Sequence, residues 1–139
     1  MANNPVSLRI PAETRAAIDD TVRRTGRDLS SVVNEMLGEA VKLRRIPGVA
    51  FADGANGRVA VIAGTGLEVW EVIDQFRAMG EDWDGLKAGF DWLSDFQLRA
   101  ALAYAEAYPE EIKVQVNDNA SWTPDRVWSR YPFMKPPAR

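Results

Sequence analysis

The chain has 139 residues and a formal net charge of −3, and it contains neither cysteine nor histidine. Without cysteine it can form no disulfide and no thiolate metal site, and without histidine it lacks the commonest catalytic base and metal ligand. We therefore expect no enzyme, no cofactor and no metal site. The sequence has no run of about 18 apolar residues and no apolar leader, so we expect no membrane span and a cytoplasmic protein.

The charge is distributed unevenly along the chain, which suggests that different segments have different partners. Residues 1–46 carry a net +2, residues 47–116 carry −7 and residues 117–139 carry +2. The dipeptide Pro47-Gly48 marks the first boundary, because proline and glycine interrupt regular structure. We therefore divide the chain into an N-terminal domain at 1–46, a middle domain at 47–116 and a tail at 117–139.

A short strand is predicted near the N-terminus. The apolar Val6, Leu8 and Ile10 alternate with Ser7 and Arg9, and this period of two indicates a half-buried strand. One short strand has no neighbour to satisfy its backbone groups and is not stable alone. We therefore expect it to pair, antiparallel, with the same strand of a second copy, which makes the protein a homodimer.

Two amphipathic helices are predicted to follow the strand. The first runs from about Ala12 to Thr25, and Gly26 suits its left-handed C-terminal cap. Asp28 is a favoured N-cap for the second helix. The apolar stripe of the second helix follows helical spacing and comprises Leu29, Val32, Val33, Met36, Leu37, Ala40 and Leu43. So few apolar residues make a marginal core for one copy, which again favours a dimer.

The ordered words VSLRIP, AETRAAIDDTVRRTG and RDLSSVVNEML resemble the ribbon-helix-helix family of DNA-binding proteins. The resemblance implies paired strands in the major groove and a DNA phosphate at the start of the second helix. Carried onto this chain, it implies DNA-binding roles for Ser7, Arg9, Asn4, Arg27, Leu29, Ser30 and Ser31. Arg9 suits a bidentate contact to guanine. The alternative is that Ser7 and Arg9 form only the solvated face of a surface strand.

The middle domain is predicted to hold a β-hairpin and three short helices. Asn56-Gly57 lies between two alternating apolar runs, which is a strong hairpin signal. The segment Ser94-Asp95-Phe96-Gln97 has the form of a capping box before the last of the helices, which we expect to end near Tyr108. This order of elements favours a winged or homeodomain-like domain.

Three features of this domain have a functional and a structural interpretation. Residues 64–66, Gly-Thr-Gly, lack the spacing and lysine of a phosphate loop, so we favour a tight turn. The acidic residues within 81–84 could form a metal site, but acidic side chains are also favoured at the start of a helix. The tryptophans Trp70, Trp83 and Trp92 are interpreted as core rather than as a cofactor site.

The words AGTGLEVWEVI and DWLSDFQLRAALAYAEAYPEEI resemble a small bacterial domain family of unknown function that occurs in VapB-type antitoxins. The resemblance covers about residues 47–114. A domain with a charge of −7 is a poor DNA surface unless Arg58, Arg77 and Arg99 cluster. We therefore interpret it as a dimerisation or partner-docking domain, with a second DNA-reading domain as the alternative.

The tail shows no helical or strand periodicity, and its four prolines favour an irregular, extended segment. Its aromatic and arginine residues are the types that dominate protein interfaces, which predicts a strap that orders on a partner. The VapB resemblance implies that this partner is a PIN-domain ribonuclease toxin, whose acidic pocket an antitoxin arginine can enter. The toxin-binding candidates are Trp122, Arg126, Trp128, Arg130, Tyr131 and Phe133. The alternative is a tail that folds back onto its own chain or its twin.

The sequence thus predicts a mainly α fold, with a ribbon-helix-helix dimerisation module, a small winged or homeodomain-like domain and an irregular tail. The predicted function is the antitoxin of a type II toxin–antitoxin system. Such a protein neutralises a PIN-domain ribonuclease and represses its own operon by binding operator DNA. The alternative is a stand-alone dimeric transcriptional regulator with no toxin partner.

Overall fold

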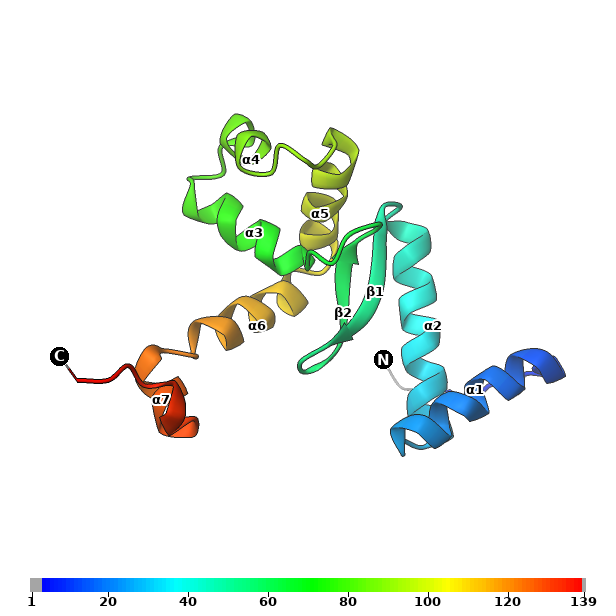
Figure 1. Cartoon of the computed structure of the whole chain (residues 1–139). Coiled ribbons are helices and arrows are strands. Elements are labelled where there is room, and N and C mark those ends of the chain that lie inside the picture. The colour runs from blue at the N-terminus through cyan, green and yellow to red at the C-terminus, as the bar shows by residue number, and fades with distance from the viewer. Residues whose placement is uncertain (1–3, 139) are drawn as a thin grey trace. The chain divides into compact units, whose positions relative to one another are not determined.

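The computed structural model describes residues 4–138, and the chain divides into two compact units between Arg44 and Arg45. Unit 1 lies before this boundary and holds α1 (Ala12–Thr25) and nearly all of α2 (Leu29–Arg45). Unit 2 follows it and holds a two-stranded sheet and the remaining helices (Figure 1). Within residues 4–138, none of the helices combines the length and apolar character needed to cross a membrane.

Unit 1 consists of two helices joined by a short turn. Gly26 has a φ of 69° and its N–H donates to the Val22 carbonyl, which ends α1 in the predicted left-handed cap. At the start of α2, the Ser31 N–H donates to Asp28 Oδ1 at 2.7 Å. Among the described residues of this unit, only Ile18 and Val32 are buried. A single copy of unit 1 therefore has very little core.

The predicted ribbon-helix-helix fold is wrong for this structure, because the N-terminal unit is helical and has no strand among its described residues. Residues 4–11 adopt no regular secondary structure, and Val6 and Leu8 are 76% and 70% exposed. The physical reason is that alternation marks a strand only where a neighbouring strand accepts its hydrogen bonds. The single chain offers the alternating residues no such neighbour.

The predicted hairpin is present in unit 2. Strands β1 (Val49–Gly54) and β2 (Gly57–Ile62) pair antiparallel, with Val49 opposite Ile62 at the open end. Gly54 is opposite Gly57 at the turn, and Gly57 has a φ of 111° that a side chain would strain. Residues 59–62 of β2 are all buried, so both faces of this strand are covered there, and Ala60 and Ile62 point into the main core.

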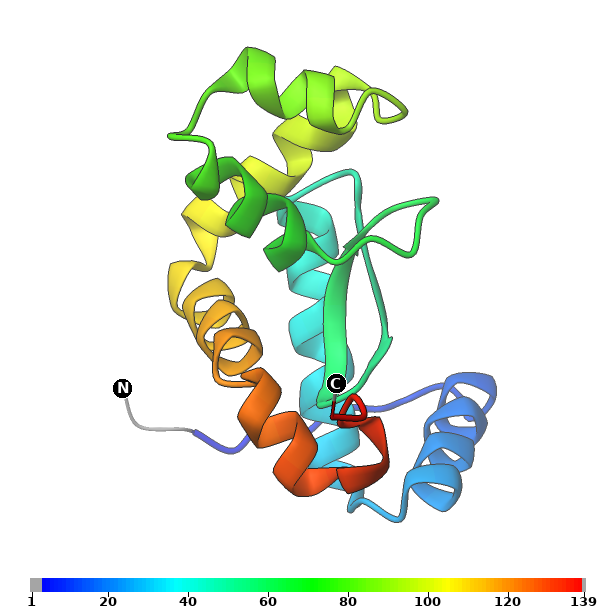
Figure 2. The same cartoon turned by 60° about the vertical axis from the view of Figure 1, so that its left-hand side comes forward.

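Four helices complete the body of unit 2: α3 (Val69–Ala78), α4 (Trp83–Gly89), α5 (Asp95–Ala107) and α6 (Pro109–Ala120). Helix α3 packs against α4, α5 and α6, and α5 lies against both strands (Figures 1 and 2). The side chains at the centre of this core are almost wholly shielded from solvent and include Ile62, Val69, Val72, Leu86, Leu98, Tyr104 and Ile112.

The three-helix prediction for this domain is wrong, because α6 is a fourth helix and contributes the buried Ile112. The sequence predicts that the last helix ends near Tyr108, with Pro109 after it, and α5 does end at Ala107. Pro109 then occupies the first turn of α6, where a missing N–H costs no helical hydrogen bond. The capping box is as predicted: the Gln97 N–H donates to Ser94 Oγ at 3.2 Å, and the Ser94 N–H donates to Gln97 Oε1 at 2.8 Å.

The irregular tail is also a wrong prediction. Residues 117–120 continue α6, and α7 (Pro124–Arg130) and the 3₁₀ turn η1 (Pro132–Met134) follow. Thr123 Oγ1 caps α7 by accepting a hydrogen bond from the Arg126 N–H at 3.3 Å. As in α6, a proline occupies the first turn of each element, where its missing N–H removes no helical hydrogen bond.

The Gly-Thr-Gly segment at 64–66 is the predicted tight turn. Thr65 Oγ1 donates to the Ile62 carbonyl at 2.8 Å and accepts the Leu67 N–H at 3.0 Å, so the hydroxyl closes the turn internally. The tryptophan prediction is right in part. Trp70 and Trp83 pack against the core, whereas Trp92 is 61% exposed.

Candidate partner-binding surfaces

The N-terminal arm, residues 4–11, carries three of the predicted DNA-binding residues. Asn4, Ser7 and Arg9 are all exposed and lie outside any helix or strand. The structure therefore presents these side chains to solvent on one continuous segment. It does not hold them in a rigid array, because the arm has no ladder of backbone hydrogen bonds.

The start of α2 was predicted to bind phosphate through the amides of Leu29, Ser30 and Ser31. In the structure the Asp28 carboxylate already accepts the Ser31 N–H, and this hydrogen bond lowers the pKa of Asp28 below its ordinary value. A carboxylate at a helix N-terminus is stabilised by the helix dipole just as a phosphate is. A DNA phosphate at this end would therefore meet the negative charge of Asp28.

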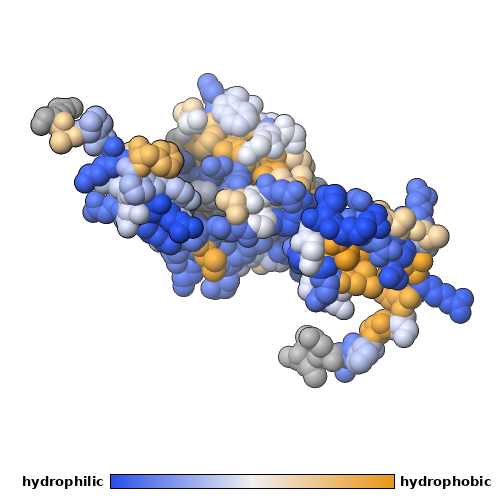
Figure 3. All heavy atoms as spheres, turned by 60° about the horizontal axis from the view of Figure 1, so that its bottom comes forward, coloured by the Kyte–Doolittle hydropathy of each residue, from blue (hydrophilic) through white to orange (hydrophobic). Residues whose placement is uncertain are grey.

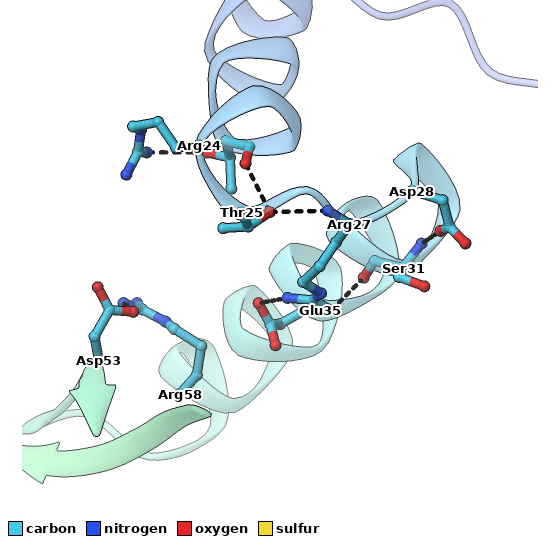
Figure 4. Close-up of polar contacts among 9 residues, drawn as sticks. Arg24, Thr25, Arg27, Asp28, Ser31, Glu35, Asp53 and Arg58 are labelled. Carbon is cyan, nitrogen blue, oxygen red and sulfur yellow. Dashed lines mark hydrogen bonds and ion pairs between the residues drawn. The ribbon is translucent and has the colours of Figure 1, made fainter. Parts of the chain in front are cut away.

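Arg27, the remaining predicted backbone contact, is held within unit 1. Its Nη1 lies 2.7 Å from Glu35 Oε1, and its Nη2 donates to the Ser31 carbonyl at 3.4 Å (Figure 4). The ion pair is only partly exposed. Arg27 thus ties the turn between the helices to the second turn of α2, and it would have to leave Glu35 to contact DNA fully.

Helix α2 presents an apolar stripe to solvent. Met36, Leu37, Val41 and Leu43 are exposed on this helix, although its pattern predicts a buried face. Figure 3 shows apolar side chains gathered on the surface of unit 1, at the right of the view. Large contiguous apolar patches on a protein surface mark contacts with another molecule. We define this set of four side chains as the α2 stripe.

The tail, here residues 121–138, brings several predicted toxin-binding residues together. The Arg126 guanidinium lies over the Trp122 ring, 4.3 Å from its centroid, and Nη1 also donates to the Ser121 carbonyl at 3.3 Å. The rings of Tyr131 and Phe133 meet edge to face with centroids 6.2 Å apart. Stacked pairs of this kind stiffen a segment that has little other packing.

The tail remains open to solvent despite these internal contacts. Phe133 is 85% exposed, and no residue of α7 or η1 is buried. The main packing of α7 is against η1, and both views place α7 beyond the end of α6, away from α4 and α5 (Figures 1 and 2). Trp128 is half-buried, and the described residues offer Arg130 no hydrogen bond or ion pair. Tyr131 and Phe133 are therefore ordered against each other and left exposed to solvent.

Two of the three arginines that could make unit 2 a DNA surface have intramolecular partners. Arg58 forms an ion pair with Asp53 across the hairpin at 3.2 Å (Figure 4), and the Arg99 guanidinium lies 4.7 Å above the Trp83 ring. Among the described residues, no cluster of acidic side chains has the arrangement of a metal site, and this includes the acidic residues within 81–84.

Sequence reasoning missed a cleft in unit 2. It has a volume of about 730 Å³ and is lined by the hairpin turn, the start of α3, one face of α6 and Trp122. The lining residues lie between positions 54 and 122, and the three segments are far apart in the sequence, so no local motif marks the cleft. The one available signal was Trp70, a large aromatic residue near the start of a helix, and it was assigned to the core.

The hairpin and the helices after it form one continuous block, and this is the block that a known family covers. Residues 51–105 match the family described as protein of unknown function, DUF433. The match confirms the coarse prediction of a small domain family of unknown function in the middle of the chain. The DUF433 region runs from β1 to α5 and leaves out unit 1, α6 and the tail. No curated protein and no solved structure matches the chain.

Proposed function

We propose that this protein is the antitoxin of a type II toxin–antitoxin pair, as the VapB resemblance implies. The observation that carries the proposal is the tail, where aromatic and arginine side chains form a locally ordered surface on which Tyr131 and Phe133 are exposed to solvent. Such side chains are the ones that supply most of the energy of protein interfaces. The proposed partner is a ribonuclease of the PIN-domain class.

Within the tail, the two arginines have different proposed roles. Arg126 is held by Trp122 and Ser121 and so stiffens the binding surface before the toxin arrives. Arg130 is exposed and has no ion-pair partner among the described residues, which leaves its guanidinium for an acidic ribonuclease site. A guanidinium entering such a site pairs with the carboxylates that would otherwise hold a divalent metal. Tyr131 and Phe133 supply the apolar anchors beside it.

Unit 1 is the proposed DNA-binding and dimerisation part of the molecule. Residues 1–46 carry a net +2, the arm presents Ser7 and Arg9 to solvent, and the α2 stripe needs an apolar partner. A second copy brings an identical stripe, which is the requirement of a twofold interface. Two arms in one dimer would read two half-sites of an operator, so the protein would repress its own operon.

The proposal is tested by co-expressing the chain with the ribonuclease that co-purifies with it from its native host. Deleting residues 117–139 is expected to abolish inhibition of the ribonuclease while operator binding is retained. Arg130→Glu is expected to weaken inhibition, and Lys135→Glu, which changes charge equally in the same tail, is the matched control. Full inhibition by the truncated chain would contradict the proposal. Tight operator binding with no ribonuclease partner would favour the stand-alone regulator instead.

A further inference from the structure

The cleft of unit 2 lies outside the surfaces that carry the proposed function, apart from Trp122 at its end. A hydrogen bond of 2.9 Å from Asn56 Nδ2 to Asp118 Oδ2 ties the hairpin turn to α6 across one side of the cleft. Glu68 and Trp70 line it from the start of α3. Its volume, about 730 Å³, lies in the range of clefts that bind ligands and peptide side chains.

The cleft is strongly negative. Four carboxylates line it, from Glu68, Glu110, Glu111 and Asp118, against one guanidinium, that of Arg58. With Arg58 included, the lining has a formal net charge of −3, and Arg58 also forms an ion pair at 3.2 Å with Asp53, which is not part of the lining. Charges of one sign along a concave wall focus their field and raise the local concentration of oppositely charged groups. The occupant that complements this cleft is therefore cationic.

Two indole rings line the same cleft. The Trp70 Nε1–H donates to the Glu68 carboxylate, which also closes the capping box of α3, so the ring is fixed in place. Trp122 also lines the cleft, and its ring already stacks with the Arg126 guanidinium in this chain. A planar guanidinium can stack on an indole and pair with a carboxylate at once, whereas a lysine ammonium is more strongly hydrated and makes weaker use of such a site.

We infer that the cleft between the hairpin turn, α3 and α6 binds an arginine-bearing segment of a partner protein. The carboxylates select positive charge, the tryptophans select a flat delocalised cation, and Val59 and Val114 offer apolar wall to the aliphatic stems. A bare metal ion fits less well, because no acidic cluster in the described part of the chain has the arrangement of a metal site. The inference stands without the antitoxin proposal, since it uses no property of the tail beyond Trp122.

The test uses the full chain and a fluorescein-labelled peptide of sequence Gly-Arg-Ala-Arg-Gly, with binding followed by fluorescence anisotropy. We expect saturable binding and shifts of the Trp70 and Trp122 indole N–H signals in NMR spectra. Glu110→Gln combined with Asp118→Asn should weaken binding about tenfold, as expected for the loss of two partly exposed ion pairs. Asp91→Asn combined with Glu106→Gln removes the same charge outside the cleft and should leave affinity within about twofold.

The double variant could also disturb the fold, because Asp118 accepts a hydrogen bond from Asn56 in the hairpin turn. The single variant Glu110→Gln leaves that hydrogen bond in place. It should weaken binding about threefold, with an unchanged circular dichroism spectrum. Equal losses in the cleft and control variants would overturn the inference. So would a lysine peptide or spermidine that binds as tightly as the arginine peptide, because either result would mark a general cation surface.

Discussion

The two units of this chain differ in how much apolar surface they bury. Unit 2 buries a continuous core in which a hairpin and four helices all take part, and Tyr104 and Ile62 are wholly shielded at its centre. The two helices of unit 1 also carry apolar side chains at helical spacing. Among the described residues of this unit, however, only Ile18 and Val32 are buried. Burial of apolar surface is the main force that opposes chain entropy. Unit 2 therefore has the core of an independent domain, whereas unit 1 leaves most of its apolar side chains uncovered.

The difference also divides the functional surfaces. The two surfaces with exposed apolar side chains that we propose as partner-binding, the α2 stripe and the tail, lie before and after the DUF433 region. That region itself holds most of the core. The cleft is the exception, because its walls are part of the packed domain. A rigid wall can preorganise charged and aromatic groups for a ligand, whereas an exposed segment gains its order partly from the partner.

The largest effect is expected from truncating the core of unit 2. Leu98→Ala removes a fully buried side chain of α5 and should lower the free energy of unfolding by about 2–5 kcal/mol. Because all five tryptophans lie in unit 2, urea unfolding followed by tryptophan fluorescence reports this unit alone. The loss should not depend on protein concentration. Val114→Ala truncates an exposed side chain of α6 and serves as the control, and equal effects of the two changes would refute the comparison.

The next effect concerns the α2 stripe. Leu37→Lys places a charge on the stripe, and loss of a leucine contact worth about 1.5–3 kcal/mol should weaken self-association at least about tenfold. Sedimentation equilibrium over a range of concentrations measures this change. Ser31→Lys adds the same charge at an exposed polar position of α2 that is not three, four or seven residues from any member of the stripe, and it should leave association nearly unchanged. If the wild-type chain is monomeric at every concentration, the proposal that the α2 stripe binds a second copy is wrong.

A smaller effect is expected at the N-terminal arm. Arg9→Ala should reduce the affinity for operator DNA by about 1–3 kcal/mol and relax the preference at one base position. Binding titrations at fixed salt with operator variants would detect both changes. Arg77→Ala removes an equal charge from unit 2 and is the matched control. If the two variants lose affinity equally at every base sequence, Arg9 acts only through its charge.

The smallest effect is a pH dependence at the turn of unit 1. Hydrogen bonds from Ser31 to Asp28 and from Arg24 to Asp20 hold both carboxyl pKa values below their ordinary range. A lowered folded pKa adds stability above the unfolded pKa, and this stability is lost as the pH falls through the folded value. Helix content of unit 1 should therefore decrease below about pH 4. Asp28→Asn should flatten this decrease in far-UV circular dichroism, whereas Asp91→Asn in unit 2 should not.

Local signals predicted several elements of the fold correctly. The Asn56-Gly57 turn, the Ser94 capping box and the Gly26 helix end depend on short-range geometry and appear where the residues indicate them. The prolines were misjudged, since Pro109 and Pro124 each begin a helix. Proline is compatible with the first turn of a helix and disrupts only its interior, so its effect depends on register, which composition does not reveal.

The candidate binding surfaces were only partly predictable, because their geometry depends on contacts that residue types alone do not reveal. The tail residues were identified from their types, and the structure added which of them stack, such as Arg126 on Trp122. The predicted ribbon failed because its alternation requires a second strand that the single chain does not provide. The cleft was missed because Glu68, Glu110 and Trp122 are distant in sequence and meet only when α3 and α6 pack together.

The amino-acid sequence by itself determined the helical content of unit 1, the hairpin, the caps and the absence of cysteine and histidine chemistry, because each depends on residue type or on neighbours within a few positions. The tertiary structure alone decided which apolar faces are covered and which are left exposed. It closed the core of unit 2 through Ile112 of α6, left the α2 stripe open, and brought four carboxylates and two indoles to one cleft. Those outcomes depend on contacts between distant segments, which no local pattern encodes.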